Sequence, residues 1–201
     1  MFRKEVLETQ FEFPFGDGSV NLVNTAEEEA RKFRHNYLGT EHLLLGYTSV
    51  ETSNLFNKLG IDTDRVRGAI EFIVGRGDKV VTSEEDLSFT PRGRETIRLG
   101  IIEAKQLDDK SLEPDHIMLG LVREGEGIAA GILEQLGLNL NKVRKGVIEI
   151  HHKQAEIRKP DSLDILRAFL SDPNQDQAKQ IYLNGVLNNL TGLLLPPSER
   201  K

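Results

Sequence analysis

Apolar residues recur every three to four positions along most of this chain, which is the spacing that places them on one face of an α-helix. Between positions 19 and 33 the apolar or small residues are Val20, Val23, Ala26, Ala30 and Phe33. The period is close to 3.6 residues, whereas a half-buried strand would show a period of 2. The pattern therefore predicts an all-α protein.

The helical pattern occurs twice. One set of residues returns 74 positions later: Phe15, Glu29-Ala30, Leu38, His42 and Leu45-Gly46 recur as Phe89, Glu103-Ala104, Leu112, His116 and Leu119-Gly120. A second set returns 77 positions later: Leu59-Gly60, Val66-Arg67 and Ile73 recur as Leu136-Gly137, Val143-Arg144 and Ile150. A fixed internal spacing indicates a repeat architecture. We expect two pseudo-symmetric units that share one core.

Capping residues divide each unit into four helices. Thr40 and Asp62 are expected N-caps in the first unit, and Thr90 is the expected N-cap before Pro91 in the second. Gly60 and Gly137 are expected to end helices, because glycine enters the left-handed region without a Cβ clash. The sequence thus predicts eight helices in two repeats.

The predicted organisation has five parts. They are an N-terminal extension (1–14), repeat 1 (15–77), a linker (78–88), repeat 2 (89–150) and a C-terminal tail (151–201). The tail lies outside the repeat, and its apolar spacing predicts two amphipathic helices over 161–170 and 177–195.

The composition excludes several classes of protein. The formal net charge is −6, and lysine and arginine lie among acids, which argues against a nucleic-acid interface. There is no cysteine, so the chain has neither a disulfide nor a thiolate metal site. No apolar run approaches the roughly 20 residues that a membrane span needs, and the first residues lack a signal-type apolar stretch. A reducing interior such as the cytoplasm is the expected location.

Four segments carry a resemblance to a known family. They are Tyr37–Gly46 (YLGTEHLLLG), Phe89–Arg92 (FTPR), Leu121–Ala130 (LVREGEGIAA) and Leu136–Arg144 (LGLNLNKVR). Together they resemble the duplicated amino-terminal domain of Clp chaperone ATPases, especially of the ClpC type, over residues 15 to 150. The resemblance implies an eight-helix domain that binds substrates and adaptors for an unfolding motor and is not itself catalytic.

The sequence contains no phosphate-binding loop of the Gly-x-x-x-x-Gly-Lys-Ser/Thr kind, so we expect no bound nucleotide and no other cofactor. Two interpretations remain. One is a free-standing accessory or adaptor protein that binds Clp ATPase subunits, Clp protease subunits, substrates or adaptors, as the small plastid Clp N-domain-like proteins do. The other is an N-terminal fragment of a ClpC-type ATPase. The foldable tail favours the first, with the plastid stroma as the location if the source is a photosynthetic eukaryote.

Two histidines hold equivalent repeat positions, and each follows an acid: Glu41-His42 and Asp115-His116. We expect both rings to be structural, each bonded to a neighbouring backbone carbonyl. No metal site is expected, because His42 has no histidine or acid four residues later on its helix. An enzyme using these four residues is the less favoured alternative, because no nucleophile or cofactor loop accompanies them.

The family resemblance implies a role for the acids. In the ClpC-type domain the glutamate of each Gly-Thr-Glu-His motif is implicated in binding the guanidinium of phosphorylated arginine, and Glu41 and Asp115 hold these positions. A carboxylate suits that ligand because its two oxygens match two N–H donors. Thr90, with Arg92 or Arg94, would contact the phosphate.

The second of these positions departs from the family motif. Glu113-Pro114-Asp115-His116 replaces Gly-Thr-Glu-His, and Gly16-Asp17 stands where threonine and glutamate would follow Phe15. An aspartate beside a phosphate would repel it. The sequence therefore favours one phosphoarginine site at most, and the simpler alternative is that both acids only begin helices.

Two other segments have a structural and a functional interpretation. Phe11 and Phe13 lie in what we expect to be an extended leader, which either covers the domain edge or docks a partner. Phe15 is expected to pack into repeat 1, as Phe89 would in repeat 2. The segment from Glu124 to Gly127 is expected to be a turn between helices, because its two glutamates disfavour an anion-binding loop.

Overall fold

The computed structural model describes residues 4–49, 54–78, 80–82 and 87–158. Nine helices and two short strands lie within these ranges. The helices are α1 (Lys4–Phe11), α2 (Asp17–Lys32), α3 (Thr40–Ser49), α4 (Asn54–Leu59), α5 (Thr63–Val74), α6 (Pro91–Gln106), α7 (Pro114–Glu124), α8 (Ile128–Gln135) and α9 (Leu140–Arg158). The strands are β1 (Tyr37–Leu38) and β2 (Ser88–Phe89). The all-α prediction is confirmed.

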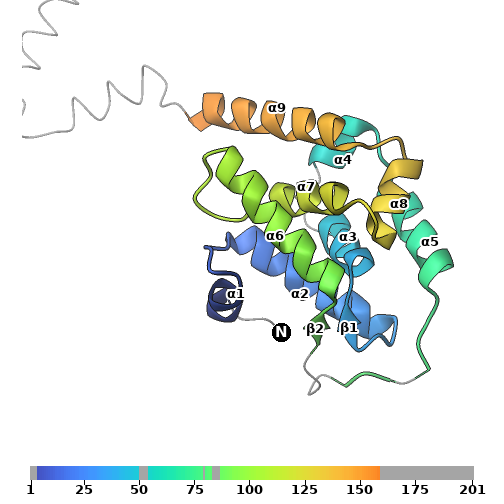
Figure 1. Cartoon of the computed structure of the whole chain (residues 1–201). Helices are drawn as coiled ribbons and strands as arrows, with labels where there is room; N and C mark the ends of the chain where they lie inside the picture. Colours follow the sequence, from blue (N-terminus) through green and yellow to red (C-terminus); the bar gives the residue numbers. More distant parts are fainter. Residues whose placement is uncertain (1–3, 50–53, 79, 83–86, 159–201) are drawn as a thin grey trace, which may run out of the picture. The chain divides into compact units, whose positions relative to one another are not determined.

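Helices α2 to α5 form the first repeat and α6 to α9 the second, four helices each. The most extensive helix contacts join α2 to α3 and α6 to α7. Helix α3 also packs against α7, so the two repeats meet there (Figure 1). One continuous cluster of buried apolar side chains extends from Leu7 to Val147 and takes residues from both repeats. The expected shared core is therefore present.

Two equivalent glycines let the central helices of each repeat approach closely. A Cβ atom at Gly46 would lie 2.5 Å from the carbonyl oxygen of Leu22, and one at Gly120 would lie 2.2 Å from that of Thr96. Any larger side chain would push the helices apart, since these neighbours are backbone atoms. The recurrence of Leu-Gly at the 74-residue spacing thus marks a helix crossing.

A buried ion pair also recurs in the two repeats. Arg67 of α5 donates to Glu29 of α2 at 2.9 Å, and Arg144 of α9 donates to Glu103 of α6 at 2.7 Å. Both glutamates are buried. In repeat 2 the fully buried Glu103 also receives Arg123 of α7 at 2.8 Å. This pair explains why glutamate and arginine recur at their respective spacings.

The segments before α2 and before α6 cross to the opposite repeat. Phe15 forms a parallel bridge with Leu112 of repeat 2, and β2 pairs in parallel with β1 so that Phe89 lies opposite Leu38 of repeat 1. Gly16 donates its N–H to the Leu112 carbonyl at 2.9 Å. Each arm therefore pairs through its backbone with the other repeat, whereas the prediction concerned the packing of the phenylalanine side chains.

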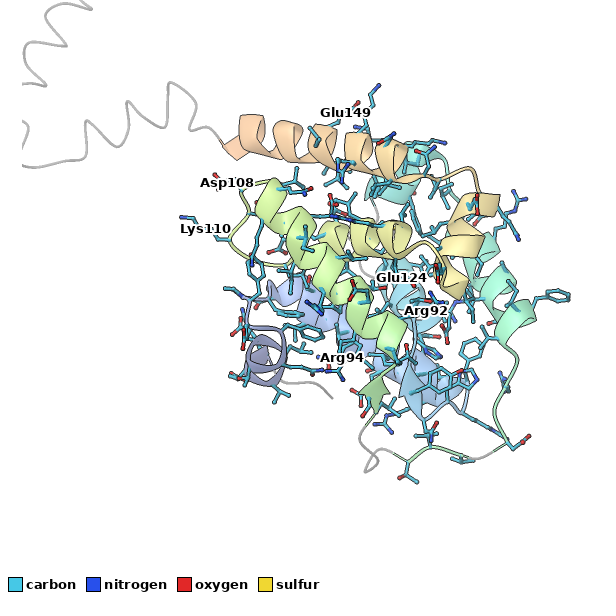
Figure 2. The ribbon with its side chains drawn as sticks, in the orientation of Figure 1. Arg92, Arg94, Asp108, Lys110, Glu124 and Glu149 are labelled. Carbon is cyan, nitrogen blue, oxygen red and sulfur yellow. The ribbon has the colours of Figure 1, made fainter. Side chains whose placement is uncertain are left out.

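The outer helices follow the same exchange. A Cβ atom at Gly146 of α9 would lie 2.6 Å from the Leu55 side chain of α4, and Lys58 of α4 pairs with Glu149 of α9 at 2.5 Å (Figure 2 labels Glu149). In the other direction α5 contacts α8. Each repeat therefore contributes a helix that covers the other.

The ends of the domain differ in detail from the prediction. The expected extended leader contains α1, and α9 continues to Arg158, past the predicted end of repeat 2 at residue 150. The helices predicted over 161–170 and 177–195 lie outside the described residues. Of the helices that the structure describes, none combines the length and the apolar character needed to cross a bilayer.

Candidate functional site

The two repeated histidines close the amino-terminal ends of α3 and α7. His42 Nδ1 accepts the backbone N–H of Gly39, and His116 Nδ1 accepts that of Glu113, both at 3.0 Å. Each ring thus reaches back from the first turn to the residue before the helix, as the glutamate of a capping box does. The bond differs from the predicted one, in which each ring bonded to a backbone carbonyl, because Nδ1 accepts a backbone N–H. For α3 this bond, and not the expected Thr40 hydroxyl, closes the helix end.

The outer nitrogen of each ring meets a second pair of equivalent positions. His42 Nε2 lies 2.9 Å from His35 Nδ1, and His116 Nε2 lies 3.1 Å from Asp109 Oδ2. A neutral ring whose Nδ1 accepts a hydrogen bond carries its proton on Nε2 and donates from there. His35 and Asp109 are 74 residues apart, so each repeat supplies an acceptor of different chemistry.

Aromatic rings enclose the histidine pair of repeat 1. The His35 ring stacks on Tyr37, with centroids 5.0 Å apart and an interplanar angle of 8°. The Phe33 ring also stacks with His35, with centroids 5.9 Å apart. Burial lowers the pKa of His42 to about 3, with a smaller effect from nearby His35. Burial also lowers the pKa of His35. Both rings are therefore neutral at pH 7.

His35, Glu41 and His42 are also a candidate metal cluster, since one ligand atom from each lies within 4.8 Å of the others. The expectation of no metal rested on His42 lacking a partner on its own helix, and His35 supplies one from the preceding loop. The hydrogen bonds nevertheless do not fit a metal. With Nδ1 engaged by Gly39, His42 carries its proton on Nε2 and has no lone pair left for coordination.

Glu41 is a buried carboxylate in the first turn of α3, with 4% of the residue exposed. Burial raises its pKa, opposed by hydrogen bonds from its own backbone N–H and from the Thr40 hydroxyl. The carboxylate lies over Gly39, where a Cβ atom would be 2.5 Å from both oxygens. Among the described residues no lysine or arginine pairs with it, so the carboxylate is buried without a compensating cation.

Thr90 lies next to this carboxylate's loop because of the β1–β2 pairing. Its N–H donates to the Leu38 carbonyl at 3.0 Å, one residue before Gly39. Its hydroxyl accepts the N–H of Gly93 at 3.0 Å, as expected for the N-cap of α6. The backbone of Thr90 therefore lies against Leu38, one residue before the glycine that the Glu41 carboxylate covers.

Arg92 and Arg94, the two arginines predicted to contact a phosphate, do not share the position of Thr90 beside the Gly39 loop. Arg92 donates to Glu124 at 2.6 Å and to Glu126 at 2.8 Å, so two carboxylates of the α7–α8 turn hold its guanidinium (Figure 2). Arg94 is exposed and lies elsewhere along α6 in the same view. The segment containing Glu124 is the helix-connecting turn that the sequence predicted.

The equivalent acids of the second repeat are already engaged. Asp115 accepts the hydroxyl of Tyr47, a residue of α3, at 2.8 Å. Glu113 fills the space beside Gly16, where a Cβ atom would lie 2.1 Å from its carboxylate, and accepts the Ser111 hydroxyl. The two pseudo-equivalent places therefore differ: Glu41 lacks a cation, whereas Asp115 already holds a donor.

Phe11 and Phe13 pack on the domain to which they belong. Phe11 meets the Phe89 ring edge to face at 5.6 Å, and the Lys105 ammonium lies 5.3 Å from the centre of the Phe13 ring. Both rings are partly buried against the core. This arrangement matches the interpretation in which the leader covers the domain edge.

Several residues of the site were not identified from the sequence. They are His35, Tyr47, Asp109, Glu124 and Glu126. The 74-residue spacing relates His35 to Asp109, and asking what each repeat places seven residues before its histidine would have found both. Tyr47 and the two glutamates act across helices, and no spacing in the sequence indicates such contacts.

A pocket of about 190 Å³ lies away from Glu41, between α2 and α5. Its lining includes Glu29 and Arg67, which already pair with each other, together with Phe33 and Arg76. We assign no ligand to it.

Comparisons with known proteins agree with this fold. The family model described as the Clp repeat (R) N-terminal domain matches residues 15–126 and 88–171. The chain is 38% identical over 146 residues to an ATP-dependent Clp protease ATP-binding subunit ClpA homolog of Guillardia theta, and 37% identical over 145 residues to the chloroplastic chaperone protein ClpC1 of rice. Each alignment covers 71% of this chain but only 18% and 16% of the relative, so the chain spans less than a fifth of their length.

Solved structures show the same fold. The N-terminal domain of the caseinolytic protease associated chaperone ClpD from Arabidopsis thaliana has a TM-score of 0.59 at 23% identity, covering 71% of this chain and 96% of that one. The N-domain of ClpV from Vibrio cholerae has a TM-score of 0.56 at 17% identity, covering 74% and 89%.

Proposed function

Because the chain belongs to the Clp repeat N-terminal domain family, we propose that it is a non-catalytic binding module of the Clp chaperone–protease system. It holds client or adaptor polypeptides, or Clp subunits, and passes them to an ATPase. The matched segment is under a fifth of each ATPase relative, and the proposal concerns this segment alone. The proposed location is the cytoplasm or, as for the chloroplastic relatives, the plastid stroma.

The observation that carries the proposal is the carboxylate of Glu41. It is 4% exposed, its pKa is raised by burial, and no cation among the described residues compensates it. Burying a carboxylate without a cation is costly, and a positively charged ligand that also hydrogen-bonds to it would recover that cost. We propose that an arginine side chain of the bound polypeptide, with or without a phosphate, is this ligand, and that Thr90 contacts it from the adjoining loop.

The proposal assigns one such site to the chain. Asp115 already accepts the Tyr47 hydroxyl, and Glu113 fills the space beside Gly16. The phosphate side of a phosphoarginine would have to come from Thr90 and the start of α6, because Arg92 is held by Glu124 and Glu126. The proposed site thus combines Glu41 of repeat 1 with Thr90 of repeat 2.

The absence of catalysis is part of the same proposal. In the enzyme alternative, Glu41, His42, Asp115 and His116 would turn over a substrate. Both rings instead use Nδ1 and Nε2 for hydrogen bonds within the fold. We expect His42→Ala and His116→Ala to lower the melting temperature and to change no turnover rate, whereas substrate-dependent turnover lost in both variants would establish the enzyme.

Peptide binding to the full chain tests the site. Fluorescein-labelled peptides that differ at one position, carrying phosphoarginine, arginine or uncharged citrulline, are titrated and followed by anisotropy. We expect the citrulline peptide to bind weakest and Glu41→Gln to weaken the charged peptides by about tenfold or more, since charge-assisted bonds contribute about 1.5–3 kcal/mol. Asp115→Asn is the matched control and should leave binding unchanged.

Co-purification tests the wider role. Tagged full-length chain is recovered from lysate of its own source, and Clp ATPase, Clp protease or adaptor subunits are identified by mass spectrometry. Their absence from the eluate would count against the module, independently of the peptide result. Equal binding of all three peptides would remove Glu41 from the site while leaving the partnership open to the second experiment.

A further inference from the structure

Helix α1 lies over the seam between the two repeats. Leu7 is fully buried, and the Phe11 ring lies 5.9 Å from that of Phe15 and 5.6 Å from that of Phe89. Phe15 and Phe89 belong to the two arms that cross between the repeats. The apolar side of α1 therefore covers the place where the arms meet, next to the start of α2 (Figure 1).

Polar contacts hold α1 at its two ends. The Lys4 ammonium pairs with Asp17 at 2.9 Å, and Glu8 accepts the backbone N–H of Phe15 at 2.9 Å. Three carboxylates act on the charge of Lys4: Glu8 belongs to α1 itself, whereas Asp17 and Glu113 belong to the surface beneath it. The seam thus has an apolar floor and a negatively charged rim.

The helix itself is short. Its eight residues are fewer than the roughly 12–15 that an isolated helix needs to persist in water, so its conformation depends on the surface beneath it. The match to the family model begins at residue 15, after α1. The helix therefore lies before the segment that the family model covers, and it rests on residues within that segment.

We propose that α1 is a displaceable occupant of a helix-binding groove at this seam. The groove accepts, in place of α1, an amphipathic helix of a partner protein that carries a basic residue followed by large apolar residues three and seven positions later. Lys4, Leu7 and Phe11 show this spacing, and the acidic rim selects the basic residue. The inference goes beyond the peptide site at Glu41, which it neither uses nor requires.

The tether sets how strongly α1 competes. A segment joined by a short connection acts at an effective concentration in the millimolar range, so a partner helix of similar affinity binds wild-type chain only weakly. The apparent dissociation constant falls as the fraction of chains with an open groove rises. Weakening α1 without altering the groove should therefore expose binding that the wild-type chain masks.

A peptide in trans tests the groove. The probe is a fluorescein-labelled peptide with the sequence of residues 1–14, titrated by anisotropy into full-length chain. We expect Leu7→Asp in the full chain to bind this peptide at least tenfold more tightly than wild type does. Val6→Asp is the matched control, because Val6 is 51% exposed on the same helix and should behave as wild type. A peptide that itself carries Leu7→Asp should not bind.

Folding of each variant is checked by far-ultraviolet circular dichroism and thermal melting. If Leu7→Asp unfolds the chain, Lys4→Glu replaces it, since reversing the charge against Asp17 weakens α1 while leaving its apolar face intact. We then expect a severalfold gain in peptide binding. A folded variant that binds no better than wild type overturns the proposal. Finding that the wild-type chain is a dimer and that the peptide dissociates it would also overturn the proposal, because α1 of a second copy would then occupy the groove.

Discussion

Replacing His42 by glutamine separates the two things that this ring does: it caps α3, and it stays neutral in the core. The glutamine amide oxygen can accept the Gly39 N–H, as in a capping box, and its NH₂ group can donate to His35. The variant thus keeps both hydrogen bonds and removes the titrating group. His42→Ala, which removes the bonds as well, is the comparison.

The magnitude follows from the pKa of His42, which is about 3 in the folded chain against 6.5 for an exposed ring. Below pH 6.5 the unfolded chain binds a proton that the folded chain does not, so the free energy of unfolding decreases as the pH falls from 6.5 towards 3. The loss is about 1.4 kcal/mol per pH unit, or about 2 kcal/mol at pH 5.

Urea unfolding followed by circular dichroism at pH 7, 6 and 5 measures this loss. We expect the wild-type chain to lose about 2 kcal/mol more than His42→Gln between pH 7 and pH 5. At pH 7 the alanine variant should be less stable than the glutamine variant by about 1 kcal/mol or more, which is the usual contribution of a cap. Equal acid losses in wild type and His42→Gln would refute the account of a buried neutral ring.

Three further substitutions and one control substitution test a helix crossing, an ion pair and a cross-repeat hydrogen bond by thermal and urea unfolding. Gly120→Ala should lower the free energy of unfolding by about 1–3 kcal/mol, because its Cβ would lie 2.2 Å from the Thr96 carbonyl oxygen. The control Gly131→Ala has nothing within 4 Å of its Cβ and should raise the free energy of unfolding by about 0.4–1 kcal/mol. A change of the same sign in both variants would contradict the close helix crossing. Glu103→Gln should cost about 3 kcal/mol, because it leaves two guanidinium groups around a buried neutral amide, and a cost below 1 kcal/mol would show the pair to be unimportant. Tyr47→Phe should cost about 1 kcal/mol by removing a cross-repeat hydrogen bond, and an unchanged midpoint would argue against that bond.

The helices and their duplication were accessible from the sequence because each leaves a periodic trace. The 3.6-residue spacing of apolar positions predicted the helices, and the 74- and 77-residue spacings predicted two equivalent units. Those spacings marked physical constraints that the structure now identifies. Gly120 recurs because a backbone carbonyl lies against it, and Glu103 recurs because an arginine 41 residues later neutralises it.

The exchange of arms was not accessible in this way. A spacing of 74 relates Phe15 to Phe89 and Leu38 to Leu112, but the same spacing would arise whether each phenylalanine met its own repeat or the other one. Only the approach of the two repeats in space decides between these pairings. The prediction for Phe15 concerned its side chain and did not include this backbone pairing.

The binding role of the candidate site stays a prediction. Glu41 and Thr90 were named from the family motif, and the β1–β2 pairing joins the Thr90 N–H to the carbonyl of Leu38, three residues before Glu41. Arg92 was assigned to a phosphate because its charge suits one, but its pairing with glutamates 32 and 34 residues later in the sequence was not predicted. Electrostatic partners on different helices leave no periodic signal, so sequence reasoning counts the charge and misses what neutralises it.

The crossing arms also say something about how such a chain arises. A single unit would have one arm without a strand to pair with and one unpaired edge at its Leu38 or Leu112 position. Two such units could pair arm to edge in a two-fold symmetric, domain-swapped dimer. Fusing the genes of that swapped pair yields the present connectivity without any new contact. Cleavage in the connection before β2 would accordingly leave two fragments that remain associated through the β1–β2 pairing and the bridge between Phe15 and Leu112.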